Sequence, residues 1–202
     1  MKPILKSTLV LLTFITVITS CRRERDPDND TSAAGDNALA ESCYSDIQSI
    51  SDEAYAGDLS GYRADTLVFG CATVIRDTTS SPRTLTIDFG TTNCSCNDGR
   101  DRRGKIITTY SGGYKDSGTV ITHTTDNYFV NDNQVLGTKV VTNMGSNTDG
   151  NIYYTIDVDG SIIKANGGGT LYWTSDRVRE FFEGASTATW SDDVYLITGN
   201  GS

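Results

Sequence analysis

The fold of this chain is decided by the stretch Ile152-Tyr153-Tyr154-Thr155-Ile156-Asp157-Val158 and by the turn residues on either side of it. Apolar side chains occupy every second position, Ile152, Tyr154, Ile156 and Val158, which is the period of a half-buried β-strand. Asp149-Gly150 precedes the stretch and Asp159-Gly160 follows it. Such pairs favour positive φ, so we expect a hairpin turn at each end of a short strand.

The same alternation extends outward from about residue 65 to the end of the chain. Leu67, Phe69, Cys71 and Ile75 share one face of a first strand, and Leu85, Ile87 and Phe89 alternate in the next. Further strands are expected at 106–110, 119–123, 128–130, 135–136, 139–142, 161–164, 170–174, 188–190 and 194–197, with turns at Asn131-Asp132-Asn133 and Asn166-Gly167. About ten short strands with short connections predict a mainly β fold, an antiparallel meander. The pattern leaves open whether the meander is an open sheet, a sandwich or a barrel.

A single helix precedes the strands. Its apolar positions Leu39, Cys43, Ile47, Ile50 and Ala54 have helical spacing, and Asp36 or Asn37 can cap it. We therefore expect one β-rich domain over 37–202, with a helix at about 37–56. The last strand, 194–197, is followed by a turn-like Gly199-Asn200-Gly201 and no further strand. It is expected to be an edge strand, or the chain is truncated at its C-terminus.

The N-terminus has the layout of a secretory signal. Lys2 and Lys6 precede a short apolar run, and Ile18-Thr19-Ser20 leads into Cys21. The apolar run is shorter than the ~20 residues that a membrane-spanning helix needs. The layout resembles a bacterial lipoprotein signal, which implies cleavage after residue 20 and a membrane anchor through lipid on Cys21. Residues 21–36 carry no large apolar side chain beyond this cysteine and are expected to form a disordered tether.

Charge and composition exclude some partners. The chain has 17 basic and 26 acidic residues, and loss of residues 1–20 removes only Lys2 and Lys6, which leaves a formal charge of −11. This balance argues against nucleic acid as a partner. A hydrophobic content of 37% suits a sheet with one wetted face.

Four further cysteines, Cys43, Cys71, Cys94 and Cys96, are candidates for disulfides in an oxidising compartment. Four cysteines allow three pairings, and the sequence does not choose among them. A metal site at Cys94-Ser95-Cys96 would need more cysteine or histidine nearby. Because His123 is the only histidine, we expect neither a metal site nor a cofactor.

Catalytic candidates are few, and we expect a protein that is not an enzyme. His123 lies in a plain strand, where it is expected to face solvent, and no Gly-x-Ser-x-Gly motif is present. Asp88 and Glu180 are acids with apolar neighbours. They support the alternative function, a glycosidase-like enzyme acting on polysaccharide, which needs two carboxyl groups roughly 5 to 9.5 Å apart.

Two clusters could bind a ligand. Arg100, Arg102 and Arg103 form a basic loop that could contact an anion, or could be neutralised by Asp98 and Asp101. Tyr153, Tyr172 and Trp173 could form an aromatic platform for sugars, although such residues also pair across strands in ordinary sheets.

Several motifs resemble uncharacterised lipoproteins of Bacteroidota over residues 67–199. They are Thr86-Ile87-Asp88-Phe89-Gly90, Cys94-Ser95-Cys96-Asn97-Asp98-Gly99-Arg100, Arg103-Gly104-Lys105-Ile106 and Asn131-Asp132-Asn133-Gln134-Val135-Leu136-Gly137-Thr138-Lys139. The resemblance implies an envelope compartment and a β-rich fold, and it implies no activity. Arg22 is not the aspartate that retains many lipoproteins in the inner membrane, which favours the outer membrane or the cell surface. We expect a binding or structural role there, with an envelope protein or a glycan as partner.

Overall fold

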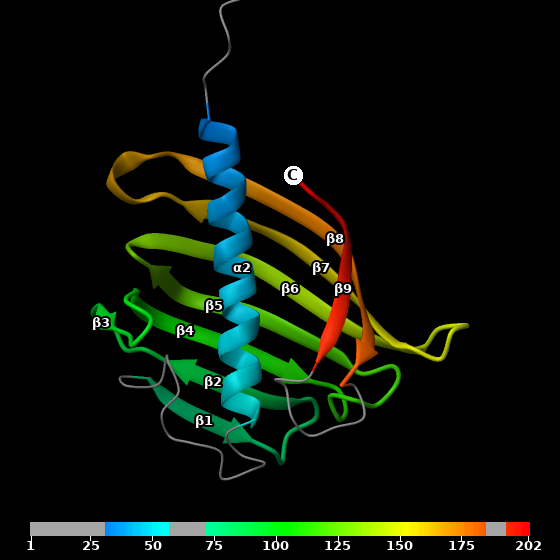
Figure 1. The fold of residues 1–202 in the computed structure, drawn as a ribbon. Coiled ribbons are helices and arrows are strands. Elements are labelled where there is room, and N and C mark those ends of the chain that lie inside the picture. The colour runs from blue at the N-terminus through cyan, green and yellow to red at the C-terminus, as the bar shows by residue number, and fades with distance from the viewer. Residues whose placement is uncertain (1–30, 57–71, 185–192) are drawn as a thin grey trace, which may run out of the picture. The chain divides into compact units, whose positions relative to one another are not determined.

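The computed structural model describes residues 31–56, 72–184 and 193–202 (Figure 1). The predicted signal peptide, the lipid attachment at Cys21, the tether up to residue 30, Cys71 and the strand at 188–190 lie outside the described residues. The chain divides into two units, residues 1–31 and 32–202.

The second unit contains one long helix followed by a nine-stranded antiparallel sheet. The elements are α2 (Ser32–Ala56), β1 (Thr73–Asp77), β2 (Arg83–Asp88), β3 (Cys94–Ser95), β4 (Asp101–Tyr110), β5 (Val120–Val130), β6 (Asn133–Ser146), β7 (Ile152–Ile163), the 3₁₀ turn η1 (Ala165–Gly167), β8 (Thr170–Glu183) and β9 (Val194–Gly201). The strand order is β1-β2-β4-β5-β6-β7-β8-β9, with the short β3 paired to β4. The predicted antiparallel meander is confirmed. The sequence did not distinguish among an open sheet, a sandwich and a barrel, and the structure shows an open sheet.

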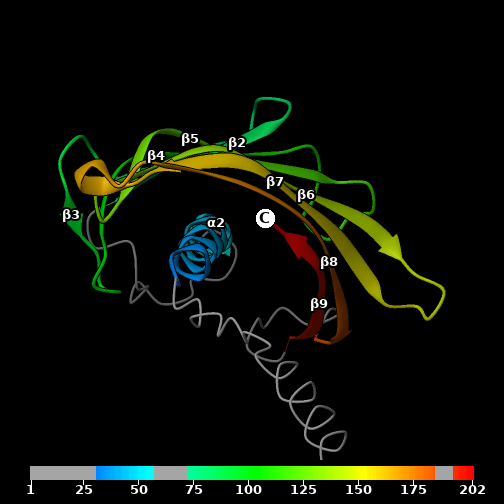
Figure 2. The same cartoon turned by 90° about the horizontal axis from the view of Figure 1, so that it is seen from above.

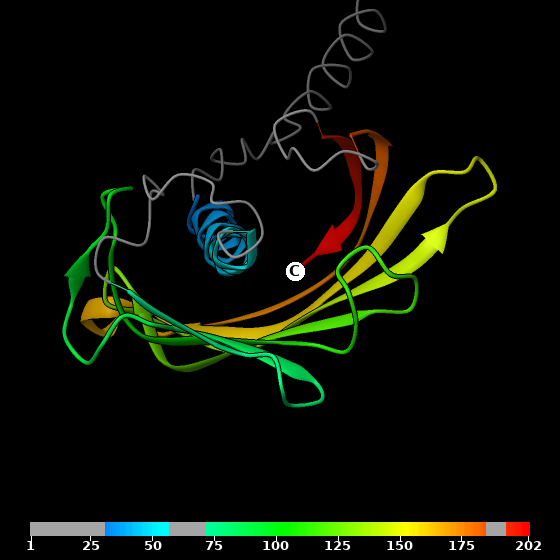
Figure 3. The same ribbon diagram turned by 90° about the horizontal axis from the view of Figure 1, so that it is seen from below.

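The sheet is curved, and α2 lies against its concave face (Figures 2 and 3). The curvature has a local cause, because the register shifts at four places, between Arg103/Lys105, Thr124/Phe129, Asn143/Ser146 and Phe181/Glu183. Such bulges bend and twist a strand. At the first of them Gly104 has φ +84°, and a Cβ there would lie 1.9 Å from the Asn127 carbonyl oxygen.

The core lies between α2 and the concave face of the sheet. On the helix, the predicted stripe residues Cys43, Ile47, Ile50 and Ala54 are buried, whereas Leu39 is only partly buried. On the sheet, every second residue of the central strands points to the helix. The buried members include Leu85, Ile87, Ile106, Tyr110, Ile121, Val135, Val141, Tyr154, Ile156, Val158, Trp173 and Phe181.

The helix begins at Ser32, five residues before the predicted start at residue 37, so residues 32–36 of the predicted tether are helical. Ala33 and Ala34 favour this extension, and no proline interrupts it. Asp36 is therefore not the cap. Its carboxylate accepts a hydrogen bond from the Lys164 ammonium at 2.9 Å, which ties this end of the helix to the end of the β7–β8 hairpin.

Three of the strands are longer than predicted, because β5, β6 and β7 each join two predicted strands into one. Asn131 and Asp132 (φ 48° and 63°), Gly150 (φ 85°) and Asn166-Gly167 (φ 55° and 74°) form turns as expected. The turn predicted at Asp159-Gly160 is wrong, since β7 runs through both residues. Gly160 pairs with Gly137 of β6, and a Cβ on Gly160 would lie 2.0 Å from the Tyr44 hydroxyl. This glycine makes room for a helix side chain instead of turning the chain.

Candidate binding site

Exposed apolar side chains gather at one edge of the sheet. Seven of the eleven large hydrophobic residues recorded as exposed belong to β8 or β9. They are Tyr172, Val178, Phe182, Val194, Tyr195, Leu196 and Ile197. The last four are consecutive, and each is 47 to 50% exposed. Contiguous exposed apolar surface on a soluble domain marks an interaction site more often than isolated residues do.

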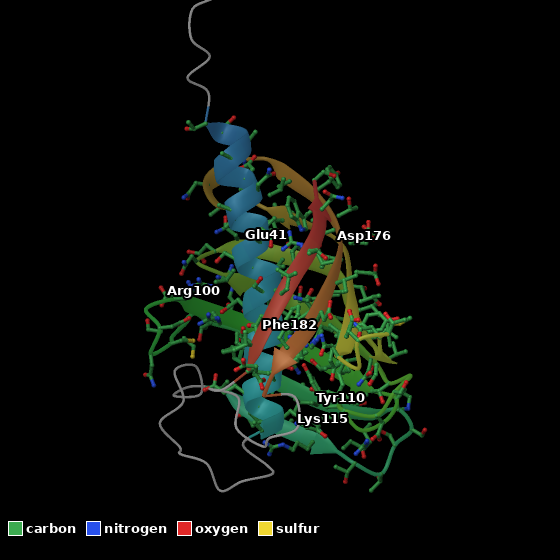
Figure 4. All side chains as sticks on the ribbon, turned by 45° about the vertical axis from the view of Figure 1, so that its right-hand side comes forward. Glu41, Arg100, Tyr110, Lys115, Asp176 and Phe182 are labelled. Carbon is green, nitrogen blue, oxygen red and sulfur yellow. The ribbon has the colours of Figure 1, made fainter. Side chains whose placement is uncertain are left out.

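The strand that carries these residues is an outer strand of the sheet. Among the described strands β9 pairs with β8 alone, so one side of its backbone faces away from the sheet (Figure 1). Exposed edge strands usually carry a charge or a proline that prevents pairing with another chain. Val194–Gly201 contains neither, in a chain with a net charge of −9. We refer to the exposed residues Val178, Phe182, Val194, Leu196 and the backbone of β9 as the β9 edge; Phe182 is labelled in Figure 4.

The two faces of β9 differ in their neighbours. Tyr195 pairs with Phe181 and Ile197 with Arg179, and these β8 residues point to the concave side, towards α2. Leu196 pairs with Glu180 and faces the convex side. The side chains of the β9 edge therefore lie on the convex face, whereas Tyr195, Ile197 and their partners on β8 lie on the concave face.

A chain of buried hydroxyl groups links α2 to the sheet. The Ser51 hydroxyl donates to the Ile47 carbonyl at 2.8 Å and lies 2.9 Å from Thr108 Oγ1, which lies 2.9 Å from His123 Nδ1. Since the Ser51 proton is already used, Thr108 must donate to Ser51 and His123 Nδ1 must donate to Thr108. His123 is then the neutral Nδ1–H tautomer.

The expectation that His123 faces solvent is wrong. The side chain is 2% exposed because α2 covers this part of β5. Burial, together with the charge of Lys139, lowers the pKa of His123 to about 3. A neutral histidine enclosed between a threonine and a helix has a structural role, and its ring stabilises the contact between helix and sheet.

The same interface contains three further ionisable groups. Lys139 on β6 is 7% exposed, and its ammonium donates to the Tyr44 carbonyl at 3.1 Å. Burial lowers the pKa of Lys139 to about 8 and raises the pKa of Asp52 on α2 to about 6. Arg179 on β8 is 8% exposed and donates to the Tyr114 hydroxyl at 2.8 Å.

The predicted basic loop does not form one open cationic patch. Arg102 is fully buried, and its guanidinium donates to Asp46 at 2.7 Å and to Asp98 at 2.6 Å. Arg100 lies 3.3 Å from Asp46, with about a third of its side chain exposed. Arg103 contacts neither Asp46 nor Asp98 and instead lies against β5.

Arg103 lies over the Phe129 ring at 3.8 Å and is paired with Asp132 at 2.5 Å. Arg102 thus fastens the loop to the helix, because Asp46 belongs to α2. An anion contact by Arg100 stays a prediction.

The two candidate catalytic acids are far apart. Asp88 lies on β2 and Glu180 on β8, five strand positions away, which corresponds to roughly 24 Å along the sheet at ~4.8 Å per step. A hydrogen bond from the Gly90 amide lowers the pKa of Asp88, and the Lys105 ammonium lies 3.2 Å away. Glu180 accepts hydrogen bonds from the side-chain amides of Asn147 and Asn151 at 2.6 and 2.8 Å. These two acids do not form a carboxylate pair.

The cysteines fall into two kinds. Cys94 is disulfide-bonded. Cys43 and Cys96 are buried thiols, and the Cys96 thiol donates to the Cys94 carbonyl at 3.6 Å. Burial and the neighbouring Asp46 raise the pKa of Cys43 to about 11, which keeps this thiol protonated at neutral pH.

The predicted aromatic platform is not assembled. Trp173 is buried and Tyr172 is exposed, as expected for adjacent residues that point to opposite faces of a strand. A different row of rings lines the concave face. Successive centroids in this row are 5.0 to 6.4 Å apart, and its members are Tyr110, Tyr55, Tyr114, Tyr154, Phe181 and Tyr195. We call this row the aromatic arc.

The composition of the arc was only partly visible in the sequence. Tyr154 belongs to the alternating set that predicted β7, and Phe181 shares the period of Trp173. Tyr114 lies in a loop and Tyr55 at the end of the helix, so no strand period could bring them to the same place.

No cluster of three metal-binding side chains occurs in residues 31–56, 72–184 and 193–202. Within the same ranges no helix has both the length and the hydropathy needed to cross a membrane. Comparison of the chain with protein-family models, curated protein sequences and solved structures found no match. By its fold, the described part of the chain is an open antiparallel sheet that curves around one helix.

Proposed function

We propose that this chain is a lipid-anchored protein of the outer membrane or cell surface that acts by binding another protein through the β9 edge. The anchor is inferred from the signal-like residues 1–20 and from Cys21. A role in binding is supported above all by the concentration of exposed apolar residues on β8 and β9.

The proposed partner contributes an extended strand that pairs with β9. An uncharged edge with an unpaired backbone side offers main-chain hydrogen bonds to such a strand, and its alternate side chains offer apolar contacts. The acidic surface of the rest of the chain repels other acidic chains, so association is favoured at this uncharged edge.

The anchor is tested with metabolic lipid labelling and protease shaving of intact cells. We expect lipid label on the wild type and none on Cys21→Ala, and we expect external protease to remove the domain from whole cells. Absence of label on the wild type would overturn the anchor. Full protection from protease would place the domain in the periplasm and overturn display at the surface.

The β9 edge is tested with a photo-reactive amino acid at position 194 in intact cells, with position 157 on the exposed side of β7 as the matched control. We expect one adduct from position 194 and none from position 157. Leu196→Lys places a charge on the edge, and it should abolish the adduct while the domain remains folded.

Two outcomes would overturn the proposed contact. Equal adducts from both positions would mean that cross-linking is unspecific. An adduct with twice the mass of the chain would show that the partner is a second copy of this protein and not a different one.

A further inference from the structure

Two buried cations in the α2–sheet interface have no ion-pair partner within residues 31–56, 72–184 and 193–202. Lys139 and Arg179 are 7% and 8% exposed, and neither has a carboxylate within 4.0 Å among the described residues. Arg102, the other buried arginine of the sheet, has two carboxylates at hydrogen-bond distance. Asp52 on α2 interacts electrostatically with both cations but forms an ion pair with neither. A buried charge whose counter-charge is not in direct contact is costly, and a bound anion would lower that cost.

Arg179 also has hydrogen-bonding capacity to spare. A guanidinium has five N–H donors, and one of those of Arg179 reaches the Tyr114 hydroxyl at 2.8 Å. Its Nε is buried and has no hydrogen-bond partner among the described residues. The nearest acid in electrostatic terms is Asp52, which also carries the hydrogen bond from the Gln48 amide at 3.4 Å.

Three rings of the aromatic arc surround this guanidinium. Its central carbon lies 5.1 Å from the Tyr154 ring, 5.2 Å from Phe181 and 5.7 Å from Tyr195. Tyr154 is fixed from behind, because Asn143 donates to its hydroxyl at 3.2 Å. Tyr195 is half exposed, and so is Ile197, the β9 residue paired with Arg179, so the rim of this group reaches the surface.

We propose that Arg179, Tyr154, Phe181 and Tyr195 form a binding site for an organic anion with an apolar body. The anionic head, a carboxylate or a sulfonate, accepts from the Arg179 Nε–H, and the apolar body lies against the rings and Ile197. A charge-assisted hydrogen bond in a site of low dielectric is stronger than one between neutral groups. This site occupies the concave side and does not depend on strand addition at the β9 edge.

The site is tested with two fluorescent probes of similar aromatic size. One is the anion 8-anilinonaphthalene-1-sulfonate, and the other is the neutral N-phenyl-1-naphthylamine. We expect saturable binding of the anion to the wild-type domain and at least tenfold weaker binding to Arg179→Met. Methionine keeps most of the volume, and replacement of a buried charge by an apolar residue commonly preserves the fold.

Arg177→Met is the matched control, because Arg177 lies two residues away on the same face and is paired with Glu41 of α2 (Glu41 is labelled in Figure 4). It should leave the affinity for the anion within twofold of wild type. Tyr195→Ala, at a half-exposed position, should weaken both probes. Displacement of the sulfonate by octanoate or by phenylacetate then distinguishes an aliphatic from an aromatic body.

Three results would overturn the site. The first is absence of saturable sulfonate binding to the wild type. The second is unchanged sulfonate affinity in Arg179→Met with a native circular dichroism spectrum. The third is an equal loss of the neutral and anionic probes in that variant, which would show apolar binding without a role for the charge.

Discussion

Asp52 and His123 lie in the same buried interface, and burial shifts the pKa of each towards the neutral form. Burial raises the pKa of Asp52 from its ordinary value of 3.8 to about 6 and lowers that of His123 from 6.5 to about 3. The folded protein therefore holds a proton on Asp52 between pH 4 and 6 that the unfolded chain releases. Over the same range the unfolded chain binds a proton on His123 that the folded protein does not.

These two effects on stability have opposite signs. As the pH falls from 6 to 4 the His123 term lowers the free energy of unfolding and the Asp52 term raises it, each by up to about 1.4 kcal/mol per pH unit. Because Asp52→Asn removes the term that raises stability, we expect this variant to lose more stability than the wild type between pH 6 and pH 4. Urea unfolding at several pH values measures this, with Asp149→Asn, an exposed turn residue, as the control. Parallel profiles for Asp52→Asn and the wild type would contradict it.

Arg102 is the residue on which the Cys94–Arg102 loop depends most. Its removal leaves Asp46 and Asp98 without the buried cation that both contact. We expect Arg102→Leu to lower the free energy of unfolding by about 3 kcal/mol. Arg103→Leu should lower it by less than about 1 kcal/mol, because the ion-pair partner of Arg103, Asp132, has more than half of its side chain exposed. Equal effects of the two substitutions in urea titrations would contradict a special role for Arg102 in holding the loop to α2.

For single residues, the sequence predicted which side chains could be important better than it predicted whether they are buried. The basic loop, the cysteines and His123 were recognised from their residue types. Their burial was not, because it depends on which face of the sheet α2 covers. Arg177 and Arg179 share the alternating period of Trp173 and Phe181, so the sequence does contain the information that both lie on the same face of β8 as these buried rings.

Where β6 and β7 pair, the position of a helix side chain requires a glycine in the sheet. Gly137 and Gly160 pair across the two strands, and the absent side chain of Gly160 leaves space for the Tyr44 hydroxyl, which donates to the Leu136 carbonyl at 2.8 Å. A Cβ on Gly160 would lie 2.0 Å from that hydroxyl and 2.4 Å from the Leu136 carbonyl oxygen.

Gly160→Ala is therefore expected to lower the free energy of unfolding by about 2 kcal/mol, since both α2 and β6 must shift. Gly35→Ala is the control, because nothing lies near its Cβ position on α2, and it should raise stability by up to about 1 kcal/mol. Thermal or urea unfolding compares the two. A neutral Gly160→Ala would mean that Tyr44 does not need its present position.

Element type and order could be predicted from periodicity, whereas element boundaries could not. Positive-φ residues marked the true turns at Asn131-Asp132, Gly150 and Asn166-Gly167. Asp159-Gly160 has the same local chemistry and forms no turn, because its glycine is needed for a contact with a residue more than 100 positions earlier in the chain. A local pattern does not contain that information.

For the molecule as a whole, stability is expected to be uneven across the sheet. Each of the central strands β4 to β7 has residues buried against α2, whereas all eight residues of β9 are exposed. Amides of β9 should exchange with solvent at least about 100-fold faster than those of β6 and β7, since few buried contacts oppose local opening. Hydrogen-exchange mass spectrometry measures this for each strand. Equal protection of β9 and β6 would indicate that the β9 edge is not available for strand addition.

The position of α2 along the chain has a consequence for the order of folding. Its contacts with the sheet join residues 92, 128 and 136 positions apart, through Tyr44–Leu136, Asp36–Lys164 and Glu41–Arg177. The helix is made first, and the last strand that it contacts is made more than a hundred residues later. If residues 1–20 direct export as proposed, the polypeptide stays incompletely folded until β8 has crossed the membrane, because its core cannot close earlier. Because the core between α2 and the sheet forms late, the chain would remain unfolded enough to pass through a secretion channel.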